Sequence, residues 1–106
     1  MTPRVLSFRK PAQAPSGPRR TPDRLLVEQM TKGDETAFHE LFARFRGTVY
    51  ATAYGALHDP EQVEATVADT FKEARCTAAA FLASNCSVSG WLTHLTRLCI
   101  AARERA

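Results

Sequence analysis

The sequence predicts an all-α fold, a compact bundle of about four helices. Apolar residues recur at spacings of three and four along several stretches, which is the period of an amphipathic helix. Acidic or hydroxyl-bearing residues stand directly before these stretches, where helix N-caps are expected. No segment alternates between apolar and polar residues as a half-buried strand would. A chain of 106 residues provides for one such domain with a modest core.

A first, short helix is predicted to begin with Thr21 as its N-cap and Pro22 at its first helical position. Gly33 is expected to end this helix as a C-terminal cap. Its short apolar stripe consists of Leu25, Leu26 and Met30.

Two longer helices are predicted to follow, with Asp34 and Asp59 as their N-caps and Pro60 at the first position of the second. The first of them has an apolar stripe made of Phe38, Leu41, Phe42, Phe45, Val49, Ala53 and Leu57. The stripe of the second consists of Val63, Val67, Phe71, Ala74 and Ala78. Both stripes follow the helical period closely.

Residues 82–88 interrupt this period with serine and asparagine, and they are predicted to form a loop. A last helix is expected to start at Ser87 or Ser89. Its predicted inner face consists of Trp91, Leu92, Leu95, Leu98, Cys99 and Ala102. Its outer face presents His94, Arg97, Arg103 and Arg105.

The positive charge of the chain is concentrated near its N-terminus. The net charge is +3, but residues 1–24 hold six basic side chains against one acidic side chain, and five of the six prolines. Because this segment lacks apolar periodicity, residues 1–20 are predicted to be a disordered arm and residues 21–106 the folded domain. The arm either contacts nucleic acid through phosphates or is only a solubilising leader, and both alternatives stay open.

The sequence lacks the patterns of an enzyme or a metal site. No cysteines or histidines are paired at metal-ligand spacing and the glycines occur singly, so neither a zinc site, a cofactor nor a catalytic activity is expected. The longest apolar run falls far short of the ~18–20 residues that a membrane span needs. The three cysteines form no disulfide framework, which favours a cytoplasmic location.

Several short motifs follow one another in a specific order between residues 23 and 106. They are Lys32-Gly33-Asp34-Glu35-x-Ala37-Phe38, Leu41-Phe42-x-x-Phe45, Val49-Tyr50-x-x-Ala53, Asp59-Pro60-Glu61 and Gly90-Trp91-Leu92-x-x-Leu95. Together they resemble region 2, the sigma-2 domain, of bacterial sigma factors of the extracytoplasmic-function group. The resemblance implies a transcription initiation factor that binds the clamp helices in the largest subunit of core RNA polymerase. It also implies melting and recognition of the promoter −10 element as single-stranded DNA.

The resemblance further assigns roles to segments. Residues 61–75 correspond to the polymerase-contacting helix, residues 82–89 to the loop that holds an extruded base, and residues 90–105 to the helix that faces the −10 DNA. The implied polymerase-facing residues are Glu64, Asp69, Lys72 and Arg75. The implied DNA-facing residues are Ser84, Asn85, Ser87, Trp91, His94, Arg97, Arg103 and Arg105.

These DNA-facing types suit an unstacked base, which needs hydrogen-bonding groups, an apolar or aromatic wall and cations for the phosphates. Two of the assignments have a purely structural alternative. Trp91 shares a face with Leu95 and Leu98, so it is also explained by core packing. The C-terminal arginines are also explained by the favourable interaction of cations with the helix dipole.

Some polar residues that are usual in this family are missing here. Ala65 and Ala68 stand where an Asp and a Gln typically contact the polymerase, and Leu98 and Ala102 replace an Asn and an Asp of the last helix. The sigma domain that recognises the −35 element lies outside the 106 residues.

Three interpretations follow. The chain is the N-terminal part of a complete sigma factor, or it is a short, divergent sigma-like protein that has exchanged promoter recognition for interaction with another protein. The third interpretation is a helical interaction module without a link to transcription. Members of the sigma family are often held by an anti-sigma factor, but no residue here identifies such a partner.

Overall fold

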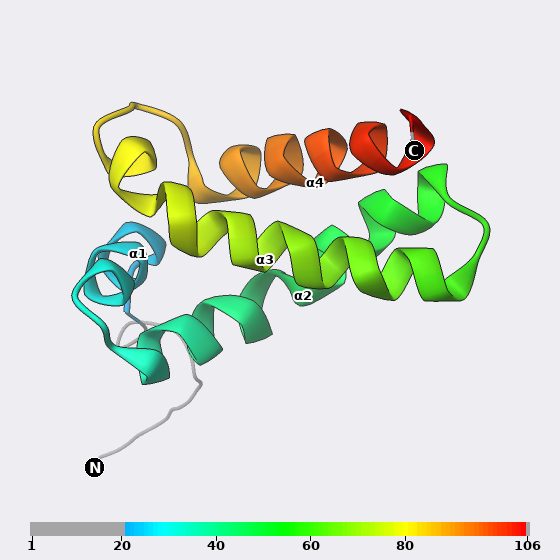
Figure 1. The fold of residues 1–106 in the computed structure, drawn as a ribbon. Coiled ribbons are helices and arrows are strands. Elements are labelled where there is room, and N and C mark those ends of the chain that lie inside the picture. The colour runs from blue at the N-terminus through cyan, green and yellow to red at the C-terminus, as the bar shows by residue number, and fades with distance from the viewer. Residues whose placement is uncertain (1–20, 106) are drawn as a thin grey trace, which may run out of the picture.

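The structure, a computed structural model, describes residues 21–105. Within this range the chain forms four helices and no strand, which confirms the predicted all-α class (Figure 1). The helices are α1 (Asp23–Thr31), α2 (Glu35–Ala56), α3 (Pro60–Leu82) and α4 (Val88–Arg105). The predicted arm, residues 1–20, lies outside the described residues. None of the four helices combines the length and the hydropathy that crossing a membrane requires.

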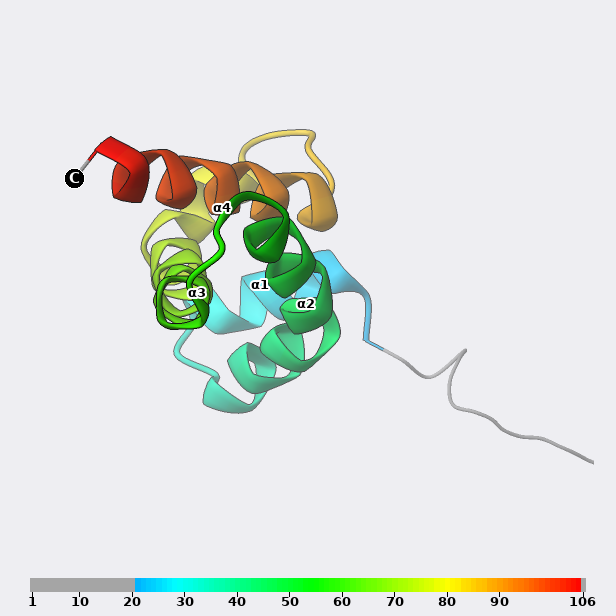
Figure 2. The same cartoon turned by 90° about the vertical axis from the view of Figure 1, so that its right-hand side faces the viewer.

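The long helices α2 and α3 run antiparallel, and α4 returns along both of them (Figure 1). Figure 2 shows α4 lying over the α2–α3 pair. The short helix α1 packs against α2 and α3 at one end of the bundle. The loop between α3 and α4 lies at this same end, so the first helix and the last loop are neighbours in space.

The helix starts follow the predicted capping pattern at three of four places, those of α2, α3 and α4. The Asp34 carboxylate accepts a hydrogen bond from the backbone N–H of Ala37 at 3.1 Å, and Asp59 accepts one from Glu61 at 3.0 Å. Gly33 has a φ of 89°, the left-handed conformation expected of a residue just after a helix end.

The predicted cap of α1 is wrong. Pro22, rather than Thr21, takes the N-cap position, and it has no side chain that could accept a hydrogen bond. The Thr21 carbonyl accepts a hydrogen bond from Arg44 of α2. The start of α1 is therefore set by a contact with another helix instead of a local cap.

Arg44 ties α1 to α2, a role that the sequence did not indicate. Its side chain is only 6% exposed and forms ion pairs with Asp23 at 2.9 Å and with Glu40 at 3.1 Å. The buried guanidinium thus has two carboxylates and one carbonyl as partners. Because a planar guanidinium can serve several acceptors at once, one side chain fixes the entry of the first helix.

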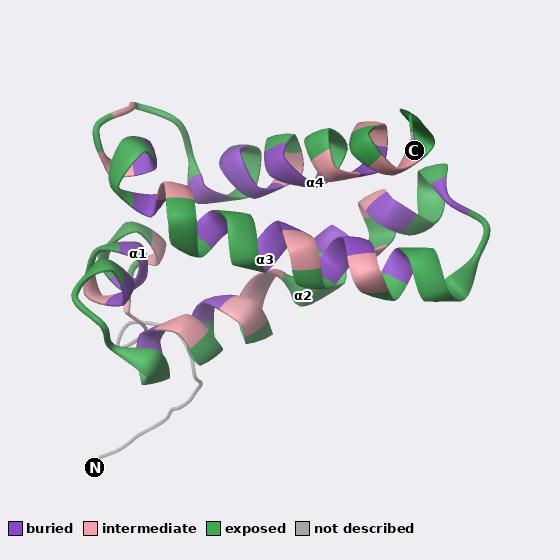
Figure 3. Cartoon of the chain, viewed as in Figure 1, coloured by how far each residue is buried: buried purple, intermediate pink, exposed green. Residues whose placement is uncertain are grey.

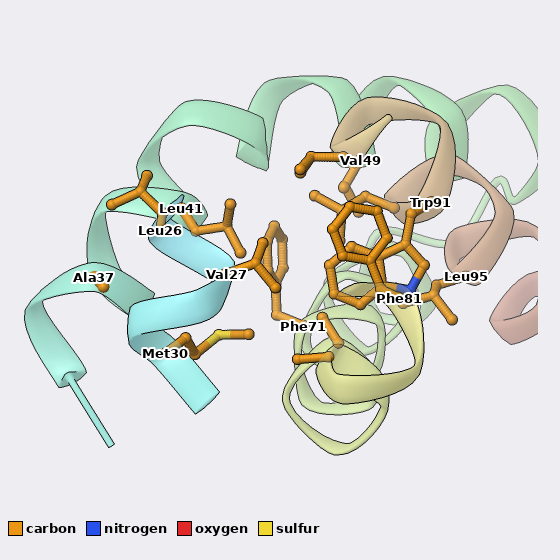
Figure 4. Packing of buried hydrophobic residues seen from close by; sticks show 14 of the residues in the cluster. Leu26, Val27, Met30, Ala37, Leu41, Val49, Phe71, Phe81, Trp91 and Leu95 are labelled. Carbon is orange, nitrogen blue, oxygen red and sulfur yellow. The ribbon is translucent and has the colours of Figure 1, made fainter. Parts of the chain in front are cut away.

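The core lies where the apolar faces of the four helices meet (Figure 3). Figure 4 shows residues of α1, α2, α3 and α4 in one continuous cluster, among them Val27, Leu41, Phe71, Phe81 and Trp91. A second, smaller cluster closes the far end with Ala53, Leu57, Val63 and Ile100. The predicted stripes of α2 and α3 supply six of the fifteen buried residues of the first cluster and three of the four of the second.

Two predicted apolar faces are partly wrong. In α1, Leu25 is 40% exposed and Val27 is fully buried in its place. In α4, Leu98 is 52% exposed and Ala102 is exposed, while Ile100 is buried.

The reason for the error in α4 is a polar residue within the true stripe. That stripe runs through Leu92, Thr96 and Ile100 at intervals of four. Thr96 is tolerated there because its hydroxyl donates to the Leu92 carbonyl at 2.7 Å. A search for apolar residues alone passes over Thr96 and selects Leu98 instead.

Two further buried threonines differ in how their hydroxyls are satisfied. Thr66 and Thr70 of α3 are both fully buried. The Thr70 hydroxyl donates to the Thr66 carbonyl at 2.8 Å. The Thr66 hydroxyl has no hydrogen-bond partner among the described residues. A buried donor without a partner lowers stability by its full desolvation cost.

Thr66→Val is therefore expected to raise the free energy of unfolding by about 1 kcal/mol, because it removes an unsatisfied hydroxyl at nearly constant volume. The matched control is Thr70→Val on the same helix, which removes a hydroxyl that is bonded and should lower stability by about 1 kcal/mol. Urea unfolding followed by circular dichroism measures both. Equal effects of the two substitutions would contradict this explanation.

Candidate nucleic-acid interface

The loop between α3 and α4, residues 83–87, is ordered by hydrogen bonds that its own serines form with residues close in sequence. The Ser84 hydroxyl donates to the Phe81 carbonyl at 2.6 Å and accepts from the backbone N–H of Cys86 at 3.3 Å. The Ser87 hydroxyl accepts from Gly90 at 3.0 Å and so caps α4, as predicted for one of the two serines. Both hydroxyls are thus already engaged in shaping the loop.

Asn85 differs from these serines. It lies in the middle of the loop and is exposed, and its side-chain amide has no hydrogen-bond partner within residues 21–105. An amide can donate and accept at the same time, as the edge of a base requires. Of the three polar loop residues, Asn85 therefore has the most hydrogen-bonding capacity left.

An arginine from the other end of the chain holds the same loop. Arg24 of α1 donates to the carbonyls of Leu82 at 2.9 Å, Cys86 at 3.1 Å and Ser84 at 3.4 Å. Its partners lie 58 to 62 residues away in the sequence. No local motif marks Arg24, so sequence reasoning missed it.

An aromatic stack lies directly beside this loop. The rings of Phe81 and Trp91 are stacked at 4.3 Å between centroids and 17° between planes (Figure 4). The Arg24 guanidinium lies over the Phe81 ring, 4.7 Å from its centroid. Trp91 is only 9% exposed, so its ring packs in the core.

The predicted cations of α4 point in different directions. His94, Arg97 and Arg105 are exposed. Arg103 instead turns toward α3 and forms an ion pair with Asp69 at 2.7 Å. Its Nε is buried and has no partner among the described residues. The exposed cations among the predicted residues of α4 are therefore Arg97 and Arg105, with the exposed His94 nearer the loop in sequence.

No family model matches the chain, and no curated protein matches it. Among solved structures, the chain is similar to an engineered region 2 of sigmaE determined by NMR in complex with GTAAAA. The TM-score is 0.74 at 23% sequence identity, and the match covers 84% of this chain and 92% of that one. The chain has the sigma region 2 fold.

In this sigma region 2 fold, the four residues predicted to face the polymerase lie along α3. Glu64 and Lys72 are exposed. The Glu64 carboxylate beside the Tyr50 hydroxyl raises the pKa of Tyr50. Asp69 is half-buried and paired with Arg103, so its carboxylate is already engaged within the molecule.

Arg75 is also engaged. It forms an ion pair with Glu35 of α2 and lies 4.3 Å from the centroid of the Phe38 ring. The hydrogen bond from Arg75 holds the pKa of Glu35 below its usual value. Both members of this pair are exposed, so a partner can still reach them.

A shallow groove opens at the far end of this sigma region 2 fold, between the C-terminal parts of α2 and α4. It has a volume of about 420 Å³ and is lined mostly by small residues. Arg97 and Glu104 supply the charges at this groove. Arg97 thus borders both the outer face of α4 and a depression that sequence reasoning did not anticipate.

Proposed function

We propose that this chain acts in transcription initiation as a sigma-like factor that binds core RNA polymerase and the single-stranded −10 element of a promoter. The observation that supports this most is the likeness of the helical body to a region 2 of sigmaE that binds GTAAAA, over 84% of the chain. Under this proposal residues 21–106 are the binding domain, residues 1–20 are an appended basic arm, and the site of action is the cytoplasm.

The candidate DNA-binding face fits the proposal in its geometry. Asn85 presents an amide without a hydrogen-bond partner among residues 21–105, in a loop whose flanking residues Phe81 and Trp91 form an aromatic stack. Exposed Arg97 and Arg105 lie on the helix that leaves this loop. Proteins bind an unstacked base with such a combination of polar groups, an apolar wall and cations.

The proposal is tested by two binding experiments with the whole chain. Fluorescence anisotropy with labelled single-stranded GTAAAA and with its complement measures DNA binding and its preference for one strand. A pull-down with purified core RNA polymerase, with and without promoter DNA, measures the second partner. Absence of binding in both experiments would leave a helical interaction module without a link to transcription.

Replacing Arg97 and Arg105 together by glutamine is expected to weaken binding to GTAAAA about tenfold and to reduce the salt slope by about 1.4, since each phosphate contact on a single strand contributes about 0.7. The matched control is Arg46→Gln with Lys72→Gln, which removes the same charge from α2 and α3. An equal loss of affinity in both double variants would mean that net charge alone, and not this face, determines binding.

A second candidate function is a divergent sigma-like regulator that binds another protein in place of the promoter. Exposed apolar residues favour it, because Leu98 and Ala102 lie on the outer side of α4 and Ala68 lies exposed on α3. Polar residues are usual at these places in the family that the sequence resembles. Polymerase capture without binding of GTAAAA would favour this candidate.

A further inference from the structure

Arg24 is the tertiary contact that holds the α3–α4 loop from outside. Within the loop, the hydrogen bonds of Ser84 and Ser87 connect residues no more than three positions apart. The three bonds from Arg24 instead connect α1 to the loop and to the last residue of α3, across about 60 residues. The hydrogen bonds between residues close in sequence shape individual turns, whereas Arg24 fixes where the loop lies relative to the bundle.

The chemistry of these contacts explains why an arginine stands there. Carbonyl oxygens at the C-terminal end of a helix lack intrahelical donors and carry the negative end of the helix dipole. Leu82 ends α3, and Ser84 and Cys86 continue the chain beyond it. A planar guanidinium donates to several such carbonyls at once and stacks on the Phe81 ring, which the single ammonium of a lysine cannot reproduce.

We propose that Arg24 is a positioning residue for nucleotide binding: it holds the α3–α4 loop in the shape in which Asn85 meets a base. The inference deepens the proposed function and rests on it. Both terminal nitrogens of Arg24 are bonded to loop carbonyls, one to Cys86 and the other to Ser84, so in this proposal the residue acts on DNA through the loop. Without it, the loop has to be ordered when the strand binds, and that entropy cost lowers the affinity.

The test compares Arg24→Gln and Arg24→Lys with Arg46→Gln, a matched control. Arg46 is an exposed arginine that also lies over aromatic rings, but it belongs to α2 and makes no contact with the loop. Amide hydrogen exchange at residues 83–87 measures the order of the loop in the absence of DNA. Amides in the middle of α2 serve as an internal reference for the stability of the whole domain.

In Arg24→Gln, exchange at residues 83–87 is expected to become about tenfold faster while the α2 reference stays unchanged. Affinity for single-stranded GTAAAA should fall about tenfold at an unchanged salt slope, because no phosphate contact is lost. Arg24→Lys should recover part of the affinity, and Arg46→Gln should retain wild-type loop exchange.

Three results would overturn the inference. They are wild-type exchange of the loop in Arg24→Gln, wild-type affinity despite a loosened loop, and a salt slope reduced by about 0.7, which would make Arg24 a direct phosphate contact. Failure of the proposed function would give another result, because the unmodified protein itself would then not bind GTAAAA. The exchange data would still report whether Arg24 orders the loop.

Discussion

Replacing Trp91 by alanine is expected to lower the free energy of unfolding by about 3–5 kcal/mol, the range for removing a large aromatic side chain from a core. Trp91 is 9% exposed and stacks on Phe81, which in turn lies beneath Arg24. Its loss leaves a cavity at the junction of α3, α4 and the loop between them. Urea unfolding followed by circular dichroism measures the effect.

A matched control for this substitution is Tyr54→Ala. Tyr54 is also stacked on an aromatic neighbour, Tyr50, but it is 53% exposed, so its loss should change stability by less than about 1 kcal/mol. Trp91→Phe, which keeps an aromatic ring in the stack, should lose much less than Trp91→Ala. A loss of below about 1 kcal/mol for Trp91→Ala would show that the ring is not part of the core and would favour a role only in binding.

Reversing the charge of Asp69 by Asp69→Arg is expected to lower the free energy of unfolding by about 2 kcal/mol, because it leaves the mostly buried Arg103 without its partner and beside a like charge. The double variant Asp69→Arg with Arg103→Asp should recover more than half of that loss. Glu73→Arg makes the same change of charge at an exposed site of the same helix and should have little effect.

The double variant also separates folding from polymerase binding. It restores the ion pair while leaving the charge on α3 reversed. If Asp69 contacts the polymerase, capture of core RNA polymerase should stay weak in the double variant although its stability returns. Full capture by the double variant would mean that Asp69 acts only inside the molecule, in its pair with Arg103.

The local features of the fold were predictable from the sequence because each depends on neighbours along the chain. Asp34 and Asp59 cap their helices through bonds to residues two and three positions away. Gly33 adopts the left-handed conformation that glycine tolerates at a helix end. The stripes of α2 and α3 were identified because all the buried positions of α2 and six of the eight of α3 are apolar.

The C-terminal half of the inner face of α4 could not be found in this way, although Trp91, Leu92 and Leu95 are buried as predicted. Its buried stripe includes Thr96, whose hydroxyl is satisfied by its own helix, so polarity was a poor guide to burial. The cap of α1 failed for a related reason, since the Thr21 carbonyl is bound by Arg44 from another helix. In both cases the satisfaction of a polar group depends on geometry that residue type does not reveal.

The sequence by itself determined that residues 21–105 are all-helical, where α2, α3 and α4 begin, and that the motifs of the chain resemble sigma region 2. These properties follow from capping, periodicity and motif order, all of which are written along the chain. Only the tertiary structure decided which polar side chains are available for binding. Arg24, Asp69, Arg75 and Arg103 are each engaged with a partner at least 34 positions away, because ion pairs and hydrogen bonds between helices depend on packing and not on sequence spacing.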